Sequence, residues 1–259
     1  MPRECPTDQV RAARTLGASG LNDREVAERL GIPRGTVRNW RRGRLPVRAR
    51  LELSGARLCE TCGTAAHDPA ALPAETYAYL LGMYLGDGCL CAVGRSWSLR
   101  ITLDSAYPEI VDECALAIEA VRGHRPSLTE CRRDAGVVLS SSWIRWSCLF
   151  PQHGPGRKHH RPIVLAGWQQ AIVDAHPRPL IRGLIHSDGW RGLNRVTVKG
   201  REYAYPRYQF SNRSDDIRRI FTDACDRVGA AWRPWGKWHI SVARRDSVAL
   251  LDEFVGVKR

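Results

Sequence analysis

Residues 80–88 read LLGMYLGDG, and residues 181–189 repeat the same pattern as IRGLIHSDG. Each stretch is an apolar segment with two small residues four positions apart, and it ends in one aspartate followed by glycine. Small residues at positions i and i+4 share one helix face and let a second backbone approach closely. A plain core helix would avoid glycine there, because glycine costs roughly 1 kcal/mol in a helix interior. We therefore predict two helices that pack against each other through Gly82, Gly86, Gly183 and Ser187.

The glycine that closes each stretch predicts where the helix ends. We expect Gly88 and Gly189 in the left-handed conformation that terminates many helices, which puts Asp87 and Asp188 in the last turn. The helix dipole disfavours a negative charge at that end. Two carboxylates in unfavourable positions predict a ligand or a metal. Two unrelated buried helices with Asp-Gly turns are the alternative, but repetition at domain-sized spacing argues against it.

Both stretches resemble, position by position, the LAGLIDADG motif of homing endonucleases, and the resemblance covers roughly residues 73–259. It implies an α+β protein with a pseudo-twofold duplicated αββαββα core, in which the two motif helices form the interface between the halves. It also implies that the penultimate acids, Asp87 and Asp188, bind a divalent metal, Mg²⁺, at the scissile phosphates of double-stranded DNA. The implied reaction is hydrolysis of both strands at a long recognition site.

The chain departs from that family at other positions. Active members usually place Gln or Asn near the end of the second strand of each half and Lys near the last strand. The first pair of positions aligns with Leu103 and Asn212, and the second with Ser140 and Ala243. One polar partner, Asn212, is therefore retained and neither lysine is. Lys199 and Lys237 would substitute only if the fold brings them close.

The second half of the chain repeats the order of elements of the first. The segment LRITLDSAYPEIVDECALAI (99–118) has its counterpart in YQFSNRSDDIRRIFTDACDRV (208–228), which supports a duplication independently of the motifs. Alternation predicts strands, and helical periodicity predicts helices with Ile110, Val111, Cys114, Leu116 and Ile118 turned inward in the first of them. The expected strands are 97–103, 127–130, 137–139, 195–198, 207–211, 231–233 and 239–242, and the expected helices are 107–121, 215–228 and 245–254.

The first fifty residues form a separate small module. Helices are expected at 8–16, after Asn22 and at 33–42, with a capping box from Asn22 to Glu25 and a turn at Gly31. Val26, Ala27, Leu30, Val37 and Trp40 fall on the inner faces. The module resembles the helix-turn-helix of resolvase-like and sigma-factor-like DNA readers, and a small bundle with a solvated basic face is the alternative. The resemblance implies base contacts from Arg34, Thr36, Arg38 and Asn39 and phosphate contacts from Arg41, Arg42 and Arg44.

A linker, residues 51–72, contains Cys59-Glu-Thr-Cys62 and then His67. A CxxC turn supplies half of a tetrahedral Zn²⁺ site. His67 is a candidate third ligand, and Cys5, Cys89 or Cys91 a fourth. A solvent-facing turn with reduced thiols is the alternative. Because Cys89 and Cys91 are alternate residues of an extended segment, we expect them on opposite faces, as packing residues.

The charge of the chain indicates a polyanionic partner. The net charge is +13, and residues 1–50 hold 12 arginines against five acids, a balance of +7. Only four basic residues are lysines, at 158, 199, 237 and 258. Nine cysteines without a secretion signal indicate reduced thiols, and we expect a cytoplasmic, nucleoid-associated monomer.

Further DNA contacts are expected from the sheets and from the connection between the halves. Alternating residues of twisted sheets would face DNA, although any half-solvated sheet shows the same alternation. The basic Gly/Pro-rich connection, residues 153–162, separates repeats 73–152 and 163–259 and is expected to cross the DNA backbone or to be a plain solvated linker. The candidates are Arg100, Thr102, Arg157, Lys158, Arg195, Thr197, Lys199, Arg207 and Gln209.

We predict a sequence-specific double-stranded DNA-binding protein and leave cleavage open among three functional hypotheses. The first is a Mg²⁺-dependent DNA endonuclease with an additional DNA-reading module. The second is a DNA-binding regulator built on an inactive LAGLIDADG core, which the missing lysines favour and the two retained aspartates disfavour. The third is an RNA-processing factor, which the helix-turn-helix module disfavours because that module reads duplex DNA.

Overall fold

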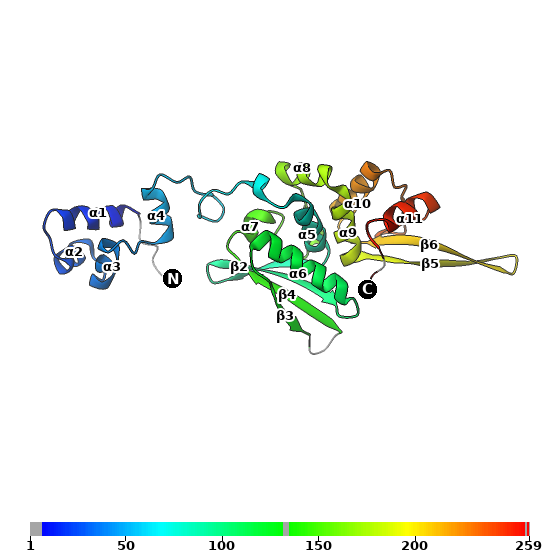
Figure 1. Cartoon of the computed structure of the whole chain (residues 1–259), viewed down its shortest axis with the longest axis horizontal. Helices are drawn as coiled ribbons and strands as arrows, with labels where there is room; N and C mark the ends of the chain where they lie inside the picture. The colour runs from blue at the N-terminus through cyan, green and yellow to red at the C-terminus, as the bar shows by residue number, and fades with distance from the viewer. Residues whose placement is uncertain (1–6, 132–134, 257, 259) are drawn as a thin grey trace. The chain divides into compact units, whose positions relative to one another are not determined.

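A computed structural model describes residues 7–131, 135–256 and 258 of the chain (Figure 1). Clustering of the backbone divides the chain into two units, residues 1–68 and 69–259. Cys5 lies outside the described residues. None of the helices in the described part of the chain has the length and apolar character that a membrane span needs.

The first unit contains four helices around a small core of its own. Asn22 accepts hydrogen bonds from two backbone amides of the second helix, and Glu25 accepts one from the Asn22 amide, so the predicted capping box is confirmed. Gly31 adopts the predicted left-handed conformation with φ of 64°. Val26, Val37 and Trp40 are buried as expected. The helices are α1 (Thr7–Ala18), α2 (Asp23–Leu30), α3 (Arg34–Arg41) and α4 (Val47–Leu53).

The helix α4 was not predicted, because its sequence was assigned to a linker. Pro46 precedes its first residue, and Ala49 is buried against the core that α1, α2 and α3 share. Packing of this one small side chain, together with the partly buried Leu45 and Leu53, stabilises a short basic segment that has little apolar periodicity of its own.

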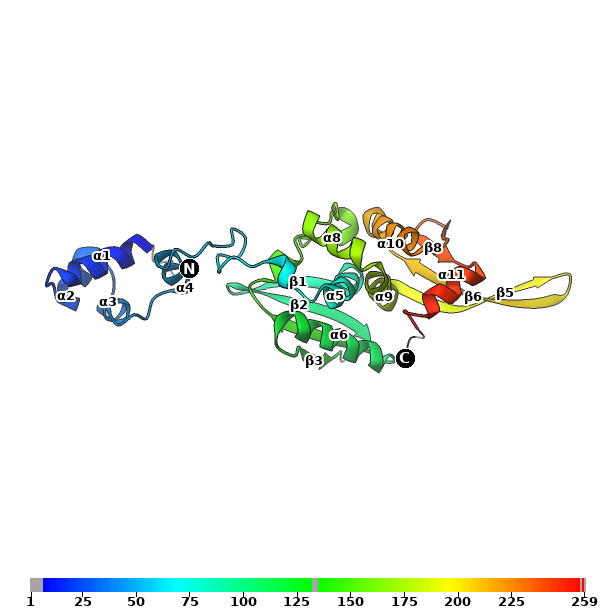
Figure 2. The same ribbon diagram turned by 45° about the horizontal axis from the view of Figure 1, so that its top comes forward.

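The second unit contains two αββαββα repeats, in agreement with the predicted fold class (Figure 2). Each repeat forms a four-stranded antiparallel sheet, with strand orders β1-β2-β4-β3 and β5-β6-β8-β7. The first repeat comprises α5 (Ala74–Asp87), β1 (Gly88–Val93), β2 (Ser96–Asp104), α6 (Pro108–Arg122), β3 (Ser127–Glu130), β4 (Gly136–Ser142) and α7 (Trp146–Leu149). The second comprises α9 (Pro177–Asp188), β5 (Gly189–Val198), β6 (Arg201–Ser211), α10 (Asp215–Val228), β7 (Arg233–Trp235), β8 (His239–Val242) and α11 (Arg245–Asp252).

Short helices join these elements. A 3₁₀ turn, η1 (Pro69–Ala71), precedes α5; a second, η2 (Lys158–His160), and the helix α8 (Gly167–Ala175) lie between the repeats.

Two details of the sequence prediction are wrong. Leu116 is 54% exposed rather than inward, since Cys114, Ala117 and Ile118 form the buried stripe of α6. The strand expected at 231–233 is shifted to β7, where Trp235 pairs with His239.

The motif helices α5 and α9 pack against each other through their small residues, as predicted. A Cβ atom added to Gly82 would lie 2.7 Å from the Leu180 carbonyl oxygen and 2.9 Å from the Gly183 carbonyl carbon. A Cβ on Gly86 would collide with the Ser187 side chain. The four small residues are therefore required by close approach of two backbones.

Gly88 and Gly189 do not have the predicted left-handed conformation. Their φ values are −88° and −105°, and both residues are extended, because each begins a strand immediately after its helix. Glycine is needed there for space instead, since an added Cβ would lie 2.6 Å from the Cα of Tyr84 or of Ile185, in the last turn of the preceding helix.

Candidate active site

Asp87 and Asp188 lie at the C-terminal ends of α5 and α9, where the two helices meet. The carboxyl carbon of Asp188 is 3.2 Å from the position of a Cβ added to Gly86, the residue before Asp87. The packing of the glycines thus brings two aspartates that are about a hundred residues apart in the sequence to one place. This convergence was predicted from the sequence.

The two carboxylates are partly desolvated and lie close to each other. The surrounding protein removes water from Asp87 and, with the neighbouring negative charge of Asp188, raises the pKa of Asp87 to about 6. Desolvation also raises the pKa of Asp188, while a hydrogen bond from Asn212 opposes that increase. Both shifts indicate a pair of oxygen ligands for which a cation is the natural partner.

Asn212 is the residue of the second repeat that the structure brings to an aspartate. Its Nδ2 donates a hydrogen bond of 2.6 Å to Asp188 Oδ2, and its own backbone amide is held by the Trp238 carbonyl at 3.0 Å. Its counterpart in the first repeat is Leu103, which is buried in the core. Among the described residues, no side chain donates an equivalent hydrogen bond to Asp87. The two halves of the site are therefore chemically unequal.

Two lysines take part in the site, neither of them at the position expected for a family lysine. The Lys158 ammonium donates to the carbonyl oxygens of Tyr84, Leu85 and Gly86 at 2.5, 3.0 and 2.8 Å. Lys258 donates to the His186 carbonyl at 3.0 Å. Burial lowers the pKa of Lys158 to about 8, while the charges of Asp188 and Asp87 oppose that decrease.

Lys158 was expected on the DNA backbone and is instead turned into the protein, so that assignment is wrong. The suggested substitutes, Lys199 and Lys237, are exposed; Lys199 lies in the β5–β6 turn with φ of 51°, and Lys237 lies over the ring of Trp238. Lys258 was missed altogether. The sequence signal that was available was the rarity of lysine: only four occur in the chain.

A cleft of about 510 Å³ opens beside the aspartates. Asp188, Asn212 and Lys158 line it together with His153, His159 and Arg161 of the inter-repeat connection, Trp238 of the β7–β8 turn and His239 of β8. Ser211 and Gln209 both contact His239 Nδ1, at 2.5 and 3.1 Å. The cleft is thus wide and basic, with one acidic point at its floor.

The sheet face that carries Arg100 and Thr102, here called the open face, is the face opposite the buried Leu99 and Ile101. In the second repeat, Arg207 and Gln209 occupy the corresponding face, opposite the buried Tyr208 and Phe210. Arg207 lies over the Trp235 ring, 5.6 Å from its centroid.

Three expectations for strand residues are corrected by the strand register. Arg195 pairs with Ala204 and Thr197 with Glu202, which places both on the face of Tyr208, opposite that of Arg207 and Gln209. Cys89 and Cys91 lie on the same face, with sulfur atoms 4.0 Å apart, because residues i and i+2 of a strand point the same way.

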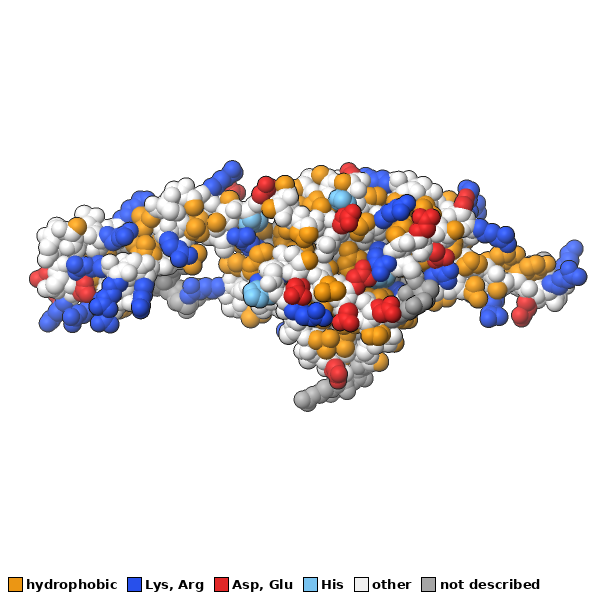
Figure 3. Space-filling model, in the orientation of Figure 1, with side chains coloured by type: hydrophobic (Ala, Val, Ile, Leu, Met, Phe, Trp, Pro, Cys, Tyr) orange, Lys and Arg blue, Asp and Glu red, His pale blue; other side chains and the backbone are white. Residues whose placement is uncertain are grey.

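In the first unit, α3 exposes Arg34, Arg38 and Asn39, with Thr36 half-buried. Arg42 and Arg44 are also exposed, and arginine side chains gather over α2 and α3 (Figure 3). Arg41 differs from the expectation, because its guanidinium forms an ion pair of 2.7 Å with Asp23 and is also bonded to the Leu21 carbonyl.

The CxxC segment of the first unit forms a tight knuckle. The amide of Gly63 donates to the Cys59 carbonyl at 2.8 Å, and Leu58 and Ala65 form a β-bridge across the turn. The thiols of Cys59 and Cys62 and a ring nitrogen of His67 all lie within 4.8 Å of one another. His67 Nδ1 is buried and has no hydrogen-bond partner among the described residues.

No family model matches the chain, and no curated protein matches it. Solved structures do. The chain is similar to I-DmoI in complex with DNA and Mn (14% identity, 70% of this chain, 97% of that chain, TM-score 0.44). It is also similar to the I-LtrWI LAGLIDADG homing endonuclease bound to target DNA (7% identity, 71% and 84%, TM-score 0.46) and to the LAGLIDADG meganuclease I-AabMI bound to uncleaved DNA (9%, 71% and 85%, TM-score 0.45).

The order of elements, the paired motif helices and the position of the two aspartates all come from the chain itself. The second unit therefore consists of two αββαββα repeats joined through their motif helices, the arrangement that the resemblance of the two motifs implied.

Proposed function

We propose that this protein binds a specific site in double-stranded DNA and cleaves it with the help of a divalent cation. The observation that carries the proposal is the convergence of Asp87 and Asp188 at the joined ends of α5 and α9, beside a basic cleft. Two carboxylates that repel each other when both are ionised are stabilised by a hard cation between them. A regulator without nuclease activity would have no need to retain that strained pair.

The residues present fit a small hard cation such as Mg²⁺. Mg²⁺ binds through one or two carboxylates plus phosphate oxygens and water. The site offers Asp188, which lines the cleft, and the neighbouring Asp87. When bound, the cation polarises the phosphate and lowers the pKa of a bound water. Asn212 fixes one oxygen of Asp188, and α5 and α9 fix the spacing of the two acids.

The open faces of the two sheets supply the DNA contacts in this proposal. Arg100, Thr102, Arg207 and Gln209 project from these faces, opposite the buried residues of the same strands. Arg157, exposed in the inter-repeat connection, is a phosphate contact. Because both half-sites are in one chain, the protein acts as a monomer.

The first unit adds a helix-turn-helix reader. Exposed Arg34, Arg38 and Asn39 on α3 would contact bases, and Arg42 and Arg44 phosphates. Arg41 is not assigned a phosphate contact, because its guanidinium is paired with Asp23.

The experiment is a paired binding and cleavage assay. Target sites are first selected from random duplexes, and cleavage is then measured with Mg²⁺, with Ca²⁺ serving in the binding assay. The control is Asp87→Asn with Asp188→Asn. Cation-dependent double-strand cuts that the double variant lacks, with binding retained, support the proposal. Tight binding without cuts, unchanged in the double variant, would make the protein a regulator, and preferential binding of single-stranded RNA would favour RNA processing.

We further propose that the knuckle holds a structural Zn²⁺. The 3.8 Å between Cys59 Sγ and His67 Nε2 is close to the roughly 3.5 Å expected between two ligands of one tetrahedral zinc. The segment from Cys59 to His67 has few apolar side chains, so a bound metal explains its defined turn better than hydrophobic packing does. The test is the zinc content of the purified protein: one equivalent is expected, lost in Cys62→Ser. Single Cys→Ser replacements elsewhere in the chain identify the fourth ligand, and absence of zinc from the wild type would reject the site.

A further inference from the structure

The four lysines of the chain divide into two pairs. Lys158 and Lys258 are half-buried and bind the C-terminal turns of the two motif helices, whereas Lys199 and Lys237 are exposed. The other basic residues are all arginines, 40 minus 4, or 36 in number. A compact ammonium at these two places therefore indicates a requirement that a guanidinium does not meet.

Lys158 reaches the end of α5 from the connection that follows the first repeat. Its three short hydrogen bonds to the carbonyls of Tyr84, Leu85 and Gly86 use all three donors of the ammonium. The ammonium also lies 5.0 Å from the centroid of the Tyr84 ring. Its charge is thus fixed one residue away from Asp87.

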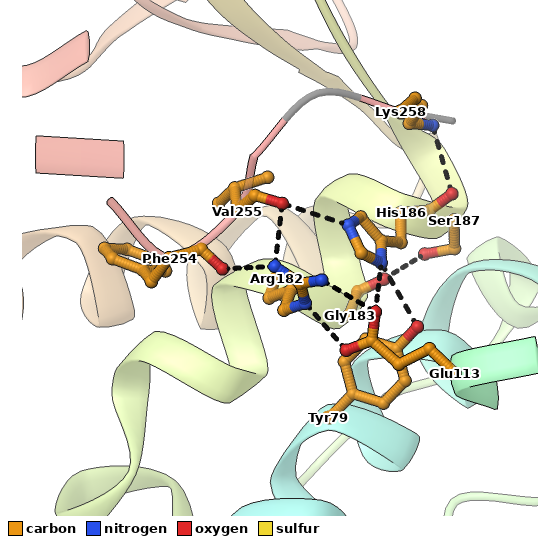
Figure 4. A network of polar contacts seen from close by, with 9 residues as sticks. All are labelled: Tyr79, Glu113, Arg182, Gly183, His186, Ser187, Phe254, Val255 and Lys258. Atoms are coloured by element: carbon orange, nitrogen blue, oxygen red, sulfur yellow. Dashed lines mark hydrogen bonds and ion pairs between the residues drawn. The ribbon is translucent and has the colours of Figure 1, made fainter. Parts of the chain in front are cut away.

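Lys258 reaches the end of α9 from the tail that follows the second repeat (Figure 4). Its acceptor, the His186 carbonyl, occupies the motif position that Leu85 has in α5, so the two lysines make equivalent contacts. Arg182 holds the tail in place through the carbonyls of Phe254 and Val255 at 2.6 and 2.9 Å.

The Arg182 contacts are themselves supported. Two hydrogen bonds of 2.7 and 2.8 Å join its guanidinium to Glu113 of α6 (Figure 4). His186 Nε2 approaches the Val255 carbonyl at 3.3 Å, and its other ring nitrogen approaches the Tyr79 hydroxyl at 3.1 Å. This network holds the tail at Phe254 and Val255, and Lys258 follows three residues after Val255.

Each repeat thus places one fixed positive charge beside the shared pair of carboxylates. Two ammonium groups balance two carboxylates, so the site is close to neutral before any metal binds. A divalent cation that enters such a site is attracted by the two carboxylates and repelled by the two ammonium groups, and DNA phosphates add the further negative charge that favours its binding.

We propose that Lys158 and Lys258 are positioning residues that keep the carboxylate pair from retaining a divalent cation until DNA is bound. This inference rests on the proposed function. It makes binding of metal and binding of DNA cooperative, and because such coupling is reciprocal, the metal also strengthens binding of DNA.

The test is Mn²⁺ binding to the full-length protein without DNA, measured by titration calorimetry for Lys158→Met and Lys258→Met. Methionine keeps the apolar stem and removes the charge. We expect each variant to bind Mn²⁺ on the order of tenfold more tightly than the wild type. Lys199→Met with Lys237→Met is the matched control and should not change the affinity. If the lysines only cap their helices, the variants bind Mn²⁺ with unchanged or weaker affinity, and the inference is overturned.

Two further measurements separate the possible failures. Thermal melting shows whether each variant is folded. If Lys158→Met does not fold, Lys258→Met still tests the inference, because Lys258 makes a single hydrogen bond to its helix. Asp87→Asn with Asp188→Asn locates the metal. Mn²⁺ binding that survives this change shows that the metal is not at the carboxylates, which rejects the proposed function. The other outcome is that the double aspartate variant no longer binds Mn²⁺, while the lysine variants bind it with the same affinity as the wild type. That result rejects only the role of the lysines.

Discussion

The side-chain amide of Asn212 lies 2.6 Å from one carboxylate oxygen of Asp188, and the first repeat has a buried leucine, Leu103, at the equivalent position. Asp188 accepts a side-chain hydrogen bond from Asn212, whereas no side chain in the described part of the chain donates one to Asp87. A duplicated fold has therefore produced a site with two unequal halves, and the inequality has consequences for cleavage.

Replacement of Asn212 by leucine should slow cleavage of one DNA strand more than the other. The partner that orients a ligating carboxylate typically contributes about 10–100-fold to activity or metal affinity. We expect a nicked duplex to accumulate, measured by separate labels on the two strands, with DNA binding unchanged. Equal slowing of both strands would show that Asn212 serves the site as a whole.

The Asp87 carboxyl should contribute a growing destabilisation of the metal-free protein as the pH rises from about 4 to about 6. The pKa of Asp87 is raised from 3.8 to about 6 in the folded state, so the folded protein holds a proton that the unfolded chain releases over this range. Asp87→Asn removes the effect and should be the more stable protein above pH 6, by about 1 kcal/mol after allowance for solvent screening.

The measurement is thermal melting in EDTA from pH 4 to pH 8, with Mg²⁺ added in a second series. The melting temperature of Asp87→Asn should rise above that of the wild type between pH 4 and pH 6, and the difference should then stay constant up to pH 8. A constant difference over the whole range would exclude titration of Asp87 as its cause.

Gly82→Ala should destabilise the second unit. The new methyl group would lie 2.7 Å from the backbone of α9, and overpacking of this kind costs about 1–3 kcal/mol, more than the gain in helix propensity. Gly167→Ala is the matched control, since an added Cβ there meets no atom within 4 Å. Urea unfolding should show a lower midpoint for the first variant alone. Equal midpoints would mean that α5 and α9 separate easily.

Arg38→Ala should weaken binding to the selected DNA site by about 1–3 kcal/mol if Arg38 reads a base. Arg11→Ala is the control, because Arg11 is equally basic but lies on α1 and is near Asp8, at 3.7 Å. Fluorescence anisotropy at several salt concentrations separates the two kinds of contact. If affinity falls for every DNA sequence and depends less steeply on salt concentration, Arg38 contacts phosphate and not a base. If Arg38→Ala and Arg11→Ala lose the same affinity, α3 is not the element that reads the DNA.

Much of the architecture follows from local signals. The spacing of small residues in the two motifs determines which helix faces meet, because only those faces allow the backbones to touch. The capping box at Asn22 and the helix Asp215–Val228 are encoded within a few residues of themselves and were predicted from the sequence. Asn212 was identified because the resemblance to the homing endonucleases implies Gln or Asn near the end of the second strand of each half.

What the sequence did not determine are the contacts between segments far apart in the chain. Lys158 and Gly86 are 72 positions apart, as are Lys258 and His186, and no local periodicity connects them. The side on which Arg195 and Thr197 lie depends on strand register, which a shift of one residue would invert. The sequence by itself determined the two helices and their aspartates, since those signals are local. Only the tertiary structure decided which cations stand beside them, because that depends on where the chain returns after each repeat.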